Sequence, residues 1–140
     1  MKSQLTGMHI YTTRCPMKRL IIVTRKEKLD DIKKIIQEKY SCGMTVTQVE
    51  GVGNQADFQD SEGVRLGKNN QLDIILMPKV RIEAVVMDNQ TEPLIEDICQ
   101  AARTGRYGDG KIFVEDVIDA IRIRTGERGE DALNTTYTQK

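Results

Sequence analysis

In Thr104-Gly105-Arg106-Tyr107-Gly108-Asp109-Gly110-Lys111-Ile112-Phe113-Val114, three glycines fall within six residues and a lysine follows them. Glycines allow left-handed backbone angles and close approach to a ligand, so successive N–H groups can converge on an anion. Residues 105–111 nearly match the phosphate-binding pattern G-x-x-x-x-G-K, but Ile112 stands where a Ser or Thr would bind magnesium. A helical pattern precedes the stretch and a strand pattern follows it, which reverses the usual flanks. The stretch therefore predicts either a phosphate cradle without a helix dipole or an ordinary glycine-rich turn.

Strand and helix patterns alternate on both sides of this loop. Strands are predicted from β-branched runs and two-residue alternation, and helices from apolar residues on one face. The predicted strands cover residues 20–23, 44–49, 78–86 and 112–114, and the predicted helices cover residues 29–40 and 91–103. The order is β-α-β-β-α-β, which predicts an α+β, ferredoxin-like sandwich with both helices on one face of an antiparallel sheet.

Three further features of the pattern carry expectations. The face of the sheet without helices would be rich in Val and Ile, so we expect copies of the chain to associate and cover it. Residues 53–77 show no steady period and are long enough to be functional or disordered. Residues 121–124 read Ile-Arg-Ile-Arg, which predicts a strand with Arg122 and Arg124 pointing to the same side.

Composition limits the class of protein. The 140 residues suit one domain, expected at 17–133, with flexible ends at 1–16 and 134–140. Lys plus Arg (21) equals Asp plus Glu (21), which disfavours a non-specific nucleic-acid binder. The three cysteines form no C-x-x-C pair, and no apolar run reaches the length of a membrane span. These features favour a cytoplasmic protein without a disulfide framework or a zinc site.

Three stretches together resemble the PII nitrogen-regulatory signal-transduction proteins: residues 43–47, 104–114 and 121–132. The similarity extends over residues 17–133. It implies a homotrimer with clefts between neighbouring subunits, where ATP and ADP bind competitively and 2-oxoglutarate joins Mg-ATP. A buried triphosphate carries about four negative charges, and such a ligand requires several fixed cations and a metal ion.

The resemblance also assigns roles to individual residues. The phosphates would contact two turns of one subunit, namely Gly51, Val52 and Gly53, and Gly108, Asp109, Gly110 and Lys111. The neighbouring subunit would supply Arg122 and Arg124, and the base and ribose would be lined by Thr45, Glu83 and Val85. Gln55 would ligate magnesium and contact 2-oxoglutarate, and Lys79 would pair with a carboxylate of 2-oxoglutarate.

The long segment departs from the family pattern. Residues 53–77 contain no tyrosine, which excludes nucleotidylation at a loop tyrosine, and Asp57 stands where a glycine is usual. An acidic side chain near the expected 2-oxoglutarate site would repel its carboxylates unless magnesium lies between them. The implied function is a sensor that docks residues 53–77 onto an ammonium transporter or a nitrogen-assimilation enzyme. The alternative is a specialised regulator of nitrogenase, or of another transporter or enzyme, that senses ADP and ATP without 2-oxoglutarate.

Two other functions can be weighed against a sensor. An ATPase would need a Ser or Thr after Lys111 and a general base, and neither is evident, so at most trace hydrolysis is expected. An RNA-recognition module on the same architecture needs aromatic residues on its central strands, and only Phe113 is found there. A regulatory binding protein is therefore favoured over an enzyme or an RNA-binding protein.

Overall fold

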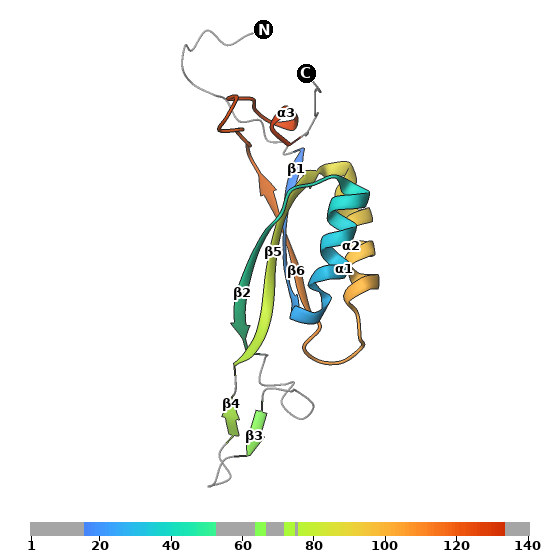
Figure 1. Ribbon diagram of the computed structural model, residues 1–140, viewed down its shortest axis with the longest axis vertical. Coiled ribbons are helices and arrows are strands. Elements are labelled where there is room, and N and C mark those ends of the chain that lie inside the picture. Colours follow the sequence, from blue (N-terminus) through green and yellow to red (C-terminus); the bar gives the residue numbers. More distant parts are fainter. Residues whose placement is uncertain (1–15, 53–63, 67–71, 75, 134–140) are drawn as a thin grey trace.

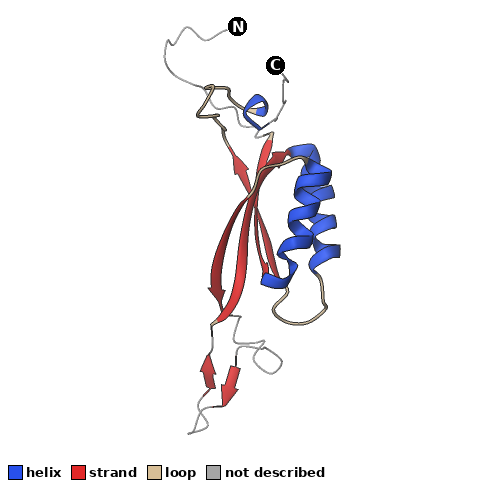
Figure 2. Cartoon of the chain, viewed as in Figure 1, coloured by secondary structure: helices blue, strands red, loops and turns tan. Residues whose placement is uncertain are grey.

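The computed structural model describes residues 16–52, 64–66, 72–74 and 76–133. Its four-stranded sheet is covered on one face by helices (Figures 1 and 2). The sheet has the strand order β2-β5-β1-β6, and each pair of neighbours is antiparallel. Its strands are β1 (Met17–Arg25), β2 (Thr45–Gly51), β5 (Met77–Met87) and β6 (Gly110–Val117). With one helical segment after β1 and another after β5, the predicted ferredoxin-like fold is confirmed.

Both helical segments lie near their predicted positions. The first begins as a 3-10 turn, η1 (Lys26–Lys28), continues as α1 (Leu29–Lys34) and ends in a π-helical turn, η2 (Ile35–Lys39). The second, α2 (Asp88–Ala102), starts three residues earlier than the apolar pattern predicted. Its start is stabilised by Gln90, whose side-chain oxygen accepts a hydrogen bond from the Met87 amide at 3.2 Å. Polar capping therefore extends the helix beyond its apolar face.

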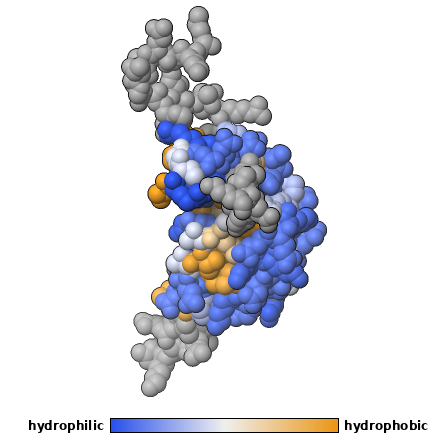
Figure 3. Space-filling model, turned by 45° about the horizontal axis from the view of Figure 1, so that its top comes forward, coloured by the Kyte–Doolittle hydropathy of each residue, from blue (hydrophilic) through white to orange (hydrophobic). Residues whose placement is uncertain are grey.

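The core lies between this helical layer and one face of the sheet. The alternating residues of β5 supply its centre, as predicted, because Val80, Ile82, Ala84 and Val86 are all buried. Leu20 and Ile22 extend it onto β1. The helices complete it with Ile32, Ile36, Leu94, Ile98 and Ala102. Outside the core, hydrophilic residues dominate the helical side, and apolar residues reach the surface in a patch beside the helices (Figure 3).

The opposite face, called here the open face, is not the apolar surface that the sequence predicted. Directly paired residues of an antiparallel sheet share a face, so the register gives mixed rows across it. One row joins Glu83, Ile21 and Phe113, and the next joins Arg81, Val23 and Lys111. Charged residues occupy these positions because the two-residue alternation of β5 and β6 places Arg, Lys and Glu opposite the core positions.

Local structure adds one feature to the predictions and corrects another. Within residues 53–77, where the sequence shows no steady period, the structure describes a short antiparallel pair, β3 (Val64–Leu66) with β4 (Leu72–Ile74). Residues 121–124 form a turn instead of a strand: Ile121 makes an isolated bridge to Arg128, and the chain then folds back. Gly126 allows this reversal, because it adopts a φ of 75° and its amide donates to the Arg122 carbonyl at 2.7 Å.

The chain beyond β6 ends in α3 (Glu130–Leu133), which contacts β5. Residues 1–15 and 134–140, which the sequence predicted to be flexible, lie outside the described residues. Pro16, also assigned to the flexible N-terminal extension, is described, and its carbonyl accepts a hydrogen bond from the Asp88 amide at 2.7 Å. In the part of the chain that the structure describes, no helix is both long and apolar enough to cross a bilayer.

Candidate functional site

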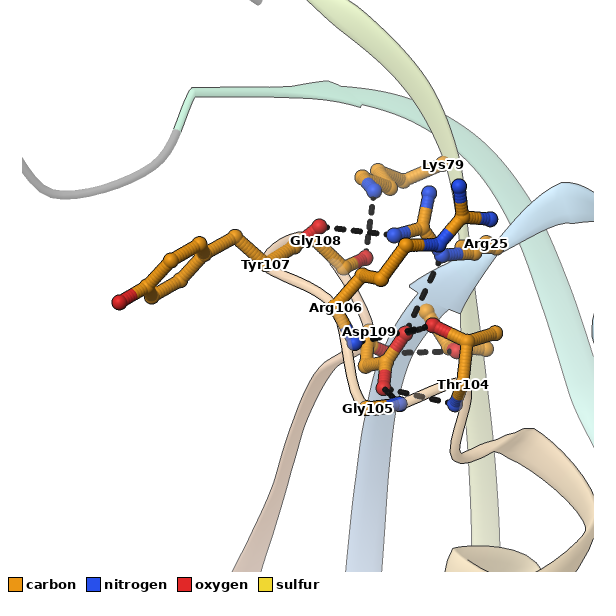
Figure 4. A network of polar contacts seen from close by, with 9 residues as sticks. Arg25, Lys79, Thr104, Gly105, Arg106, Tyr107, Gly108 and Asp109 are labelled. Atoms are coloured by element: carbon orange, nitrogen blue, oxygen red, sulfur yellow. Dashed lines mark hydrogen bonds and ion pairs between the residues drawn. The ribbon is translucent and has the colours of Figure 1, made fainter. Parts of the chain in front are cut away.

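The glycine loop, residues 103–109, joins the end of α2 to the start of β6 and folds around the carboxylate of Asp109 (Figure 4). The amides of Thr104 and Gly105 donate to Asp109 Oδ2 at 2.8 and 2.9 Å, and the Thr104 hydroxyl donates to Oδ1. Arg25 Nε completes the set at 3.2 Å from Oδ1. The Asp109 side chain therefore stabilises the loop itself, and only its backbone is left to contact a phosphate.

These contacts decide the ionisation of Asp109. Partial burial alone would raise the pKa of its carboxyl group. Hydrogen bonds from the Thr104 hydroxyl and amide, from Arg25 and from the Gly105 amide outweigh this effect and hold the pKa well below its ordinary value. The carboxylate is therefore charged at neutral pH and neutralises the guanidinium of Arg25, which is only 8% exposed.

The far side of the loop is held by three donors from β1 and β5. Arg25 Nη2 donates to the Tyr107 carbonyl at 2.7 Å, and Lys79 Nζ donates to the Gly108 carbonyl at 2.6 Å. The hydroxyl of Thr24 donates to the Asp109 carbonyl at 2.8 Å. Three successive carbonyls of the loop are thus occupied. The amides of Gly108 and Asp109 have no hydrogen-bond partner among the described residues.

Two glycines, one in the loop and one at the start of β6, adopt positive φ angles beside β1. Gly110 has a φ of 99°, and a Cβ atom there would lie 1.7 Å from the carbonyl oxygen of Val23. Gly108 also has a φ of 99°, and its Cβ atom would lie 3.1 Å from Arg25 Nη2. A side chain at position 110 would therefore collide with the backbone of β1, and one at position 108 would require a strained backbone conformation.

Several of the predicted phosphate-site residues gather at this end of the open face. Lys111 lies on β6, opposite Val23 of β1 in the strand register. Its side chain is exposed and makes no hydrogen bond or ion pair with the described residues. The turn at the end of β2 also reaches the cluster, because a Cβ atom at Gly51 would lie 3.5 Å from Lys79 Cγ. Val52 follows and is 52% exposed. Gly53 and Gln55 lie outside the described residues.

The predicted base-site and ribose-site residues lie farther along the same face. Thr45 pairs with Glu83, and Val85 follows two residues later on β5. Glu83 forms an ion pair with Arg81 Nη2 at 2.6 Å. Glu83 lies four positions after Lys79 on β5, which is roughly 13 Å along a strand. An adenosine extends over a comparable length, so one face could accommodate both groups of residues.

Arg122 and Arg124 lie at the opposite end of the molecule from the glycine loop. They follow the end of β6, whose eight residues extend over roughly 25 Å. Arg122 donates to Glu127 at 3.3 Å and to the carbonyls of Asp131 and Ala132, both at 3.2 Å. Arg124 is exposed and has no partner in the described part of the chain. The structure therefore does not bring these arginines to the loop of the same chain.

Sequence reasoning missed Arg25 and Thr24, which hold the loop in place. The β-branched run indicated a strand that ended at residue 23, whereas β1 continues to Arg25. Extending the strand by two residues would have placed Arg25 opposite Lys79 in the register with β5. Two cations facing each other beside a glycine-rich loop would have indicated a candidate anion site.

The fold and the loop define a ferredoxin-like α+β protein in which a glycine loop, Arg25 and Lys79 meet at one end of the sheet. Residues 17–127 match the family described as "Nitrogen regulatory protein P-II". The chain belongs to this family of nitrogen-regulatory signal-transduction proteins, as the sequence resemblance predicted.

Relatives and a solved structure agree with this assignment. The chain is 43% identical to "Nitrogen regulatory protein P-II 1" of Methanothermobacter thermautotrophicus over 117 residues, which is 84% of this chain and 97% of the relative. It is 44% identical to "Nitrogen regulatory protein P-II" of Rhodospirillum rubrum over 117 residues, covering 84% and 100%. It also resembles the crystal structure of Arabidopsis thaliana PII bound to citrate, with a TM-score of 0.66, 33% identity, and coverage of 87% and 96%.

Proposed function

We propose that this protein senses adenine nucleotides and regulates nitrogen metabolism by binding to other proteins. ATP and ADP would compete for clefts between the subunits of a homotrimer, and 2-oxoglutarate would join Mg-ATP. Residues 53–77 would dock onto a target such as an ammonium transporter or a nitrogen-assimilation enzyme in the cytoplasm. Membership of a family of regulatory proteins supports a site that binds the nucleotide without hydrolysing it.

One observation carries the proposal: among the described residues, the amides of Gly108 and Asp109 have no partner, and they lie next to the peptide carbonyl that Lys79 holds. Lys111 follows Asp109 by two residues and is exposed. Unpaired amides next to fixed cations are suited to phosphate oxygens, because charge-assisted hydrogen bonds to phosphate are strong. Gly108, Gly110 and Lys111 would hold the phosphates, and the backbone of Asp109 would contribute its amide. A nucleotide would bring negative charge to the ammonium groups of Lys79 and Lys111.

The separation of Arg124 from the loop supports a multi-chain site. The guanidinium of Arg124 has no partner in the ranges that the structure describes and lies at the opposite end of its own chain, so it could reach a phosphate only on a neighbouring chain. A closed ring of three chains would repeat this contact in each cleft. Thr45, Glu83 and Val85 would line the base and ribose in the same cleft.

The second effector depends on Lys79. Its ammonium group, which would pair with a carboxylate of 2-oxoglutarate, donates to the Gly108 carbonyl at 2.6 Å. Because an ammonium group has three N–H donors, a carboxylate could bind Lys79 beside that carbonyl. Asp57 supports a second candidate: a specialised regulator of nitrogenase, or of another transporter or enzyme, that senses ADP and ATP without 2-oxoglutarate. Magnesium would rely on Gln55, which lies outside the described residues.

Calorimetric titration with ATP and ADP, each with and without Mg²⁺ and 2-oxoglutarate, tests the proposal. We expect both nucleotides to bind and to compete, and we expect sedimentation to show a trimer. Lys111→Ala should weaken ATP binding, while the matched control Lys33→Ala, on the exposed surface of α1, should not. An absence of nucleotide binding, or a monomeric protein, would disprove the proposal. If 2-oxoglutarate has no effect on ATP binding, the second candidate is favoured.

A further inference from the structure

We infer that Arg25 is a positioning residue for the phosphate site: it turns the peptide groups of the glycine loop so that their amides face the ligand. This inference rests on the proposed function, because it explains how the loop would be prepared for a nucleotide. Arg25 ends β1, is 8% exposed, and contacts the loop at both Tyr107 and Asp109 (Figure 4).

The inference starts from the planarity of the peptide bond. The carbonyl of Tyr107 and the amide of Gly108 belong to one trans peptide group, so they point in opposite directions. Arg25 Nη2 holds that carbonyl at 2.7 Å and thereby turns the Gly108 amide away from β1. Lys79 acts in the same way on the next peptide group, where it holds the Gly108 carbonyl and turns the Asp109 amide outward.

The hydrogen-bonding state of the two amides agrees with this outward orientation. Neither the Gly108 amide nor the Asp109 amide has a partner within the described ranges. An amide nest of this kind binds an anion best when its orientation is fixed before the ligand arrives. The two side chains therefore prepare the backbone that the ligand would touch.

Close packing holds the Arg25 guanidinium where it can do this. A Cβ atom at position 108 would lie 3.1 Å from Arg25 Nη2 and 3.3 Å from Lys79 Nζ, so the glycine leaves room for both cations. Arg25 also presents two donors at once, Nε to Asp109 and Nη2 to Tyr107. A lysine carries one compact ammonium group and cannot reproduce this fork.

The charge of Arg25 has a separate role from its geometry. Asp109 lies 3.2 Å from Arg25 Nε and neutralises it, so Arg25 adds little net attraction for a phosphate. The charge that attracts the ligand comes from Lys111, which has no described partner. Substitutions at Arg25 that keep or remove its charge can therefore separate positioning from attraction.

The test compares Arg25→Gln, Arg25→Lys and the matched control Arg19→Gln in the full chain. Arg19 lies on the same strand and face, and pairs with Glu115 away from the loop. We expect ATP affinity, measured by calorimetry, to fall about tenfold in Arg25→Gln, the effect of losing one to two hydrogen bonds. We expect Arg25→Lys to remain several-fold weaker than the wild type, and Arg19→Gln to bind normally.

A second measurement, NMR spectroscopy of the backbone amides, follows Gly108 and Asp109 directly. In ¹⁵N-labelled wild-type protein, ATP should shift the Gly108 and Asp109 amide signals, and in Arg25→Lys the Gly108 shift should be much smaller. A purely structural role for Arg25 would lower the melting temperature and leave this shift intact in folded protein. Wild-type affinity in Arg25→Lys would show that charge alone matters and would overturn the inference.

If Arg25→Gln fails to fold, Arg25→Lys decides the question. Failure of the wild type to bind ATP would instead disprove the proposed function, and the inference with it.

Discussion

The two faces of the sheet differ in the polarity and burial of their side chains. The helical face is a continuous apolar core in which Leu20, Ile22 and Ile82 are at most 1% exposed. On the open face, rows that contain Ile21 and Val23 also carry charged side chains. The difference shows that one face stabilises the fold, whereas the other holds cations in fixed positions. Stability and ligand binding should therefore respond to substitutions on different faces.

The largest effect on stability is expected at the centre of the helical face. Ile82→Ala removes a fully buried side chain from β5 and should lower the free energy of unfolding by about 2–5 kcal/mol. The matched substitution on the open face, Thr47→Ala, alters an exposed side chain and should change it by about 0.5 kcal/mol or less. Urea unfolding measures both, and equal losses would contradict the division between the faces.

Asp109→Asn is expected to have the next largest effect. The substitution leaves the buried guanidinium of Arg25 without a charged partner and should cost about 2 kcal/mol at neutral pH. Because the folded pKa of Asp109 is depressed, its contribution is present above the ordinary value of 3.8 and is lost as the pH falls below it. Urea unfolding from pH 7 to pH 3 should therefore show a smaller acid loss in the variant. Identical pH profiles would exclude this role for Asp109.

A smaller effect is expected where the two helical segments meet. Tyr40 donates to Asp97 at 2.6 Å, and Lys39 lies 2.7 Å from the same carboxylate. Burial and the neighbouring Asp97 carboxylate raise the pKa of Tyr40 to about 12. A raised pKa stabilises the fold while the phenol is neutral, so about 1 kcal/mol should be lost as the pH rises from 10 to 12. Unfolding at high pH, with Tyr40→Phe as the control that lacks this loss, measures it.

The smallest effect is expected on the open face far from the loop. Arg19 Nε lies 3.1 Å from Glu115 in an ion pair between two partly exposed side chains. Water screens such exposed pairs, so Arg19→Gln should leave the unfolding curve nearly unchanged. High salt should remove any remaining difference. A loss as large as that of Ile82→Ala would show that the open face carries more of the stability than its exposure suggests.

Most of the fold could be predicted from the sequence because its signals are local. The alternation along β5 and the helical spacing of Leu94 and Ile98 depend on one burial pattern, which the structure confirms. The turn at residues 121–124 could not be predicted in this way. Its apolar and basic residues alternate as in a strand, and the positive φ of Gly126 decided the outcome.

The candidate site was predicted in part. The glycine spacing located the loop and Lys111, and the family resemblance located Lys79. The contacts of Arg25 join residues more than 80 positions apart in sequence, so no local pattern contains them. The inward direction of the Asp109 carboxylate depends on local contacts with Thr104 and Gly105 as well as on the long-range contact with Arg25. The sequence thus indicated which backbone could bind an anion, but the residues that orient it required the structure.

The distance between the glycine loop and Arg124 has a genetic consequence. In the proposed ring, each cleft takes its loop from one chain and its arginine from the next. Lys111→Ala and Arg124→Ala chains would each form only defective clefts alone. Any ring that mixes the two would contain one intact cleft, where the loop of an Arg124→Ala chain meets the arginine of a Lys111→Ala chain. Two inactive alleles of this gene would then complement each other when expressed together.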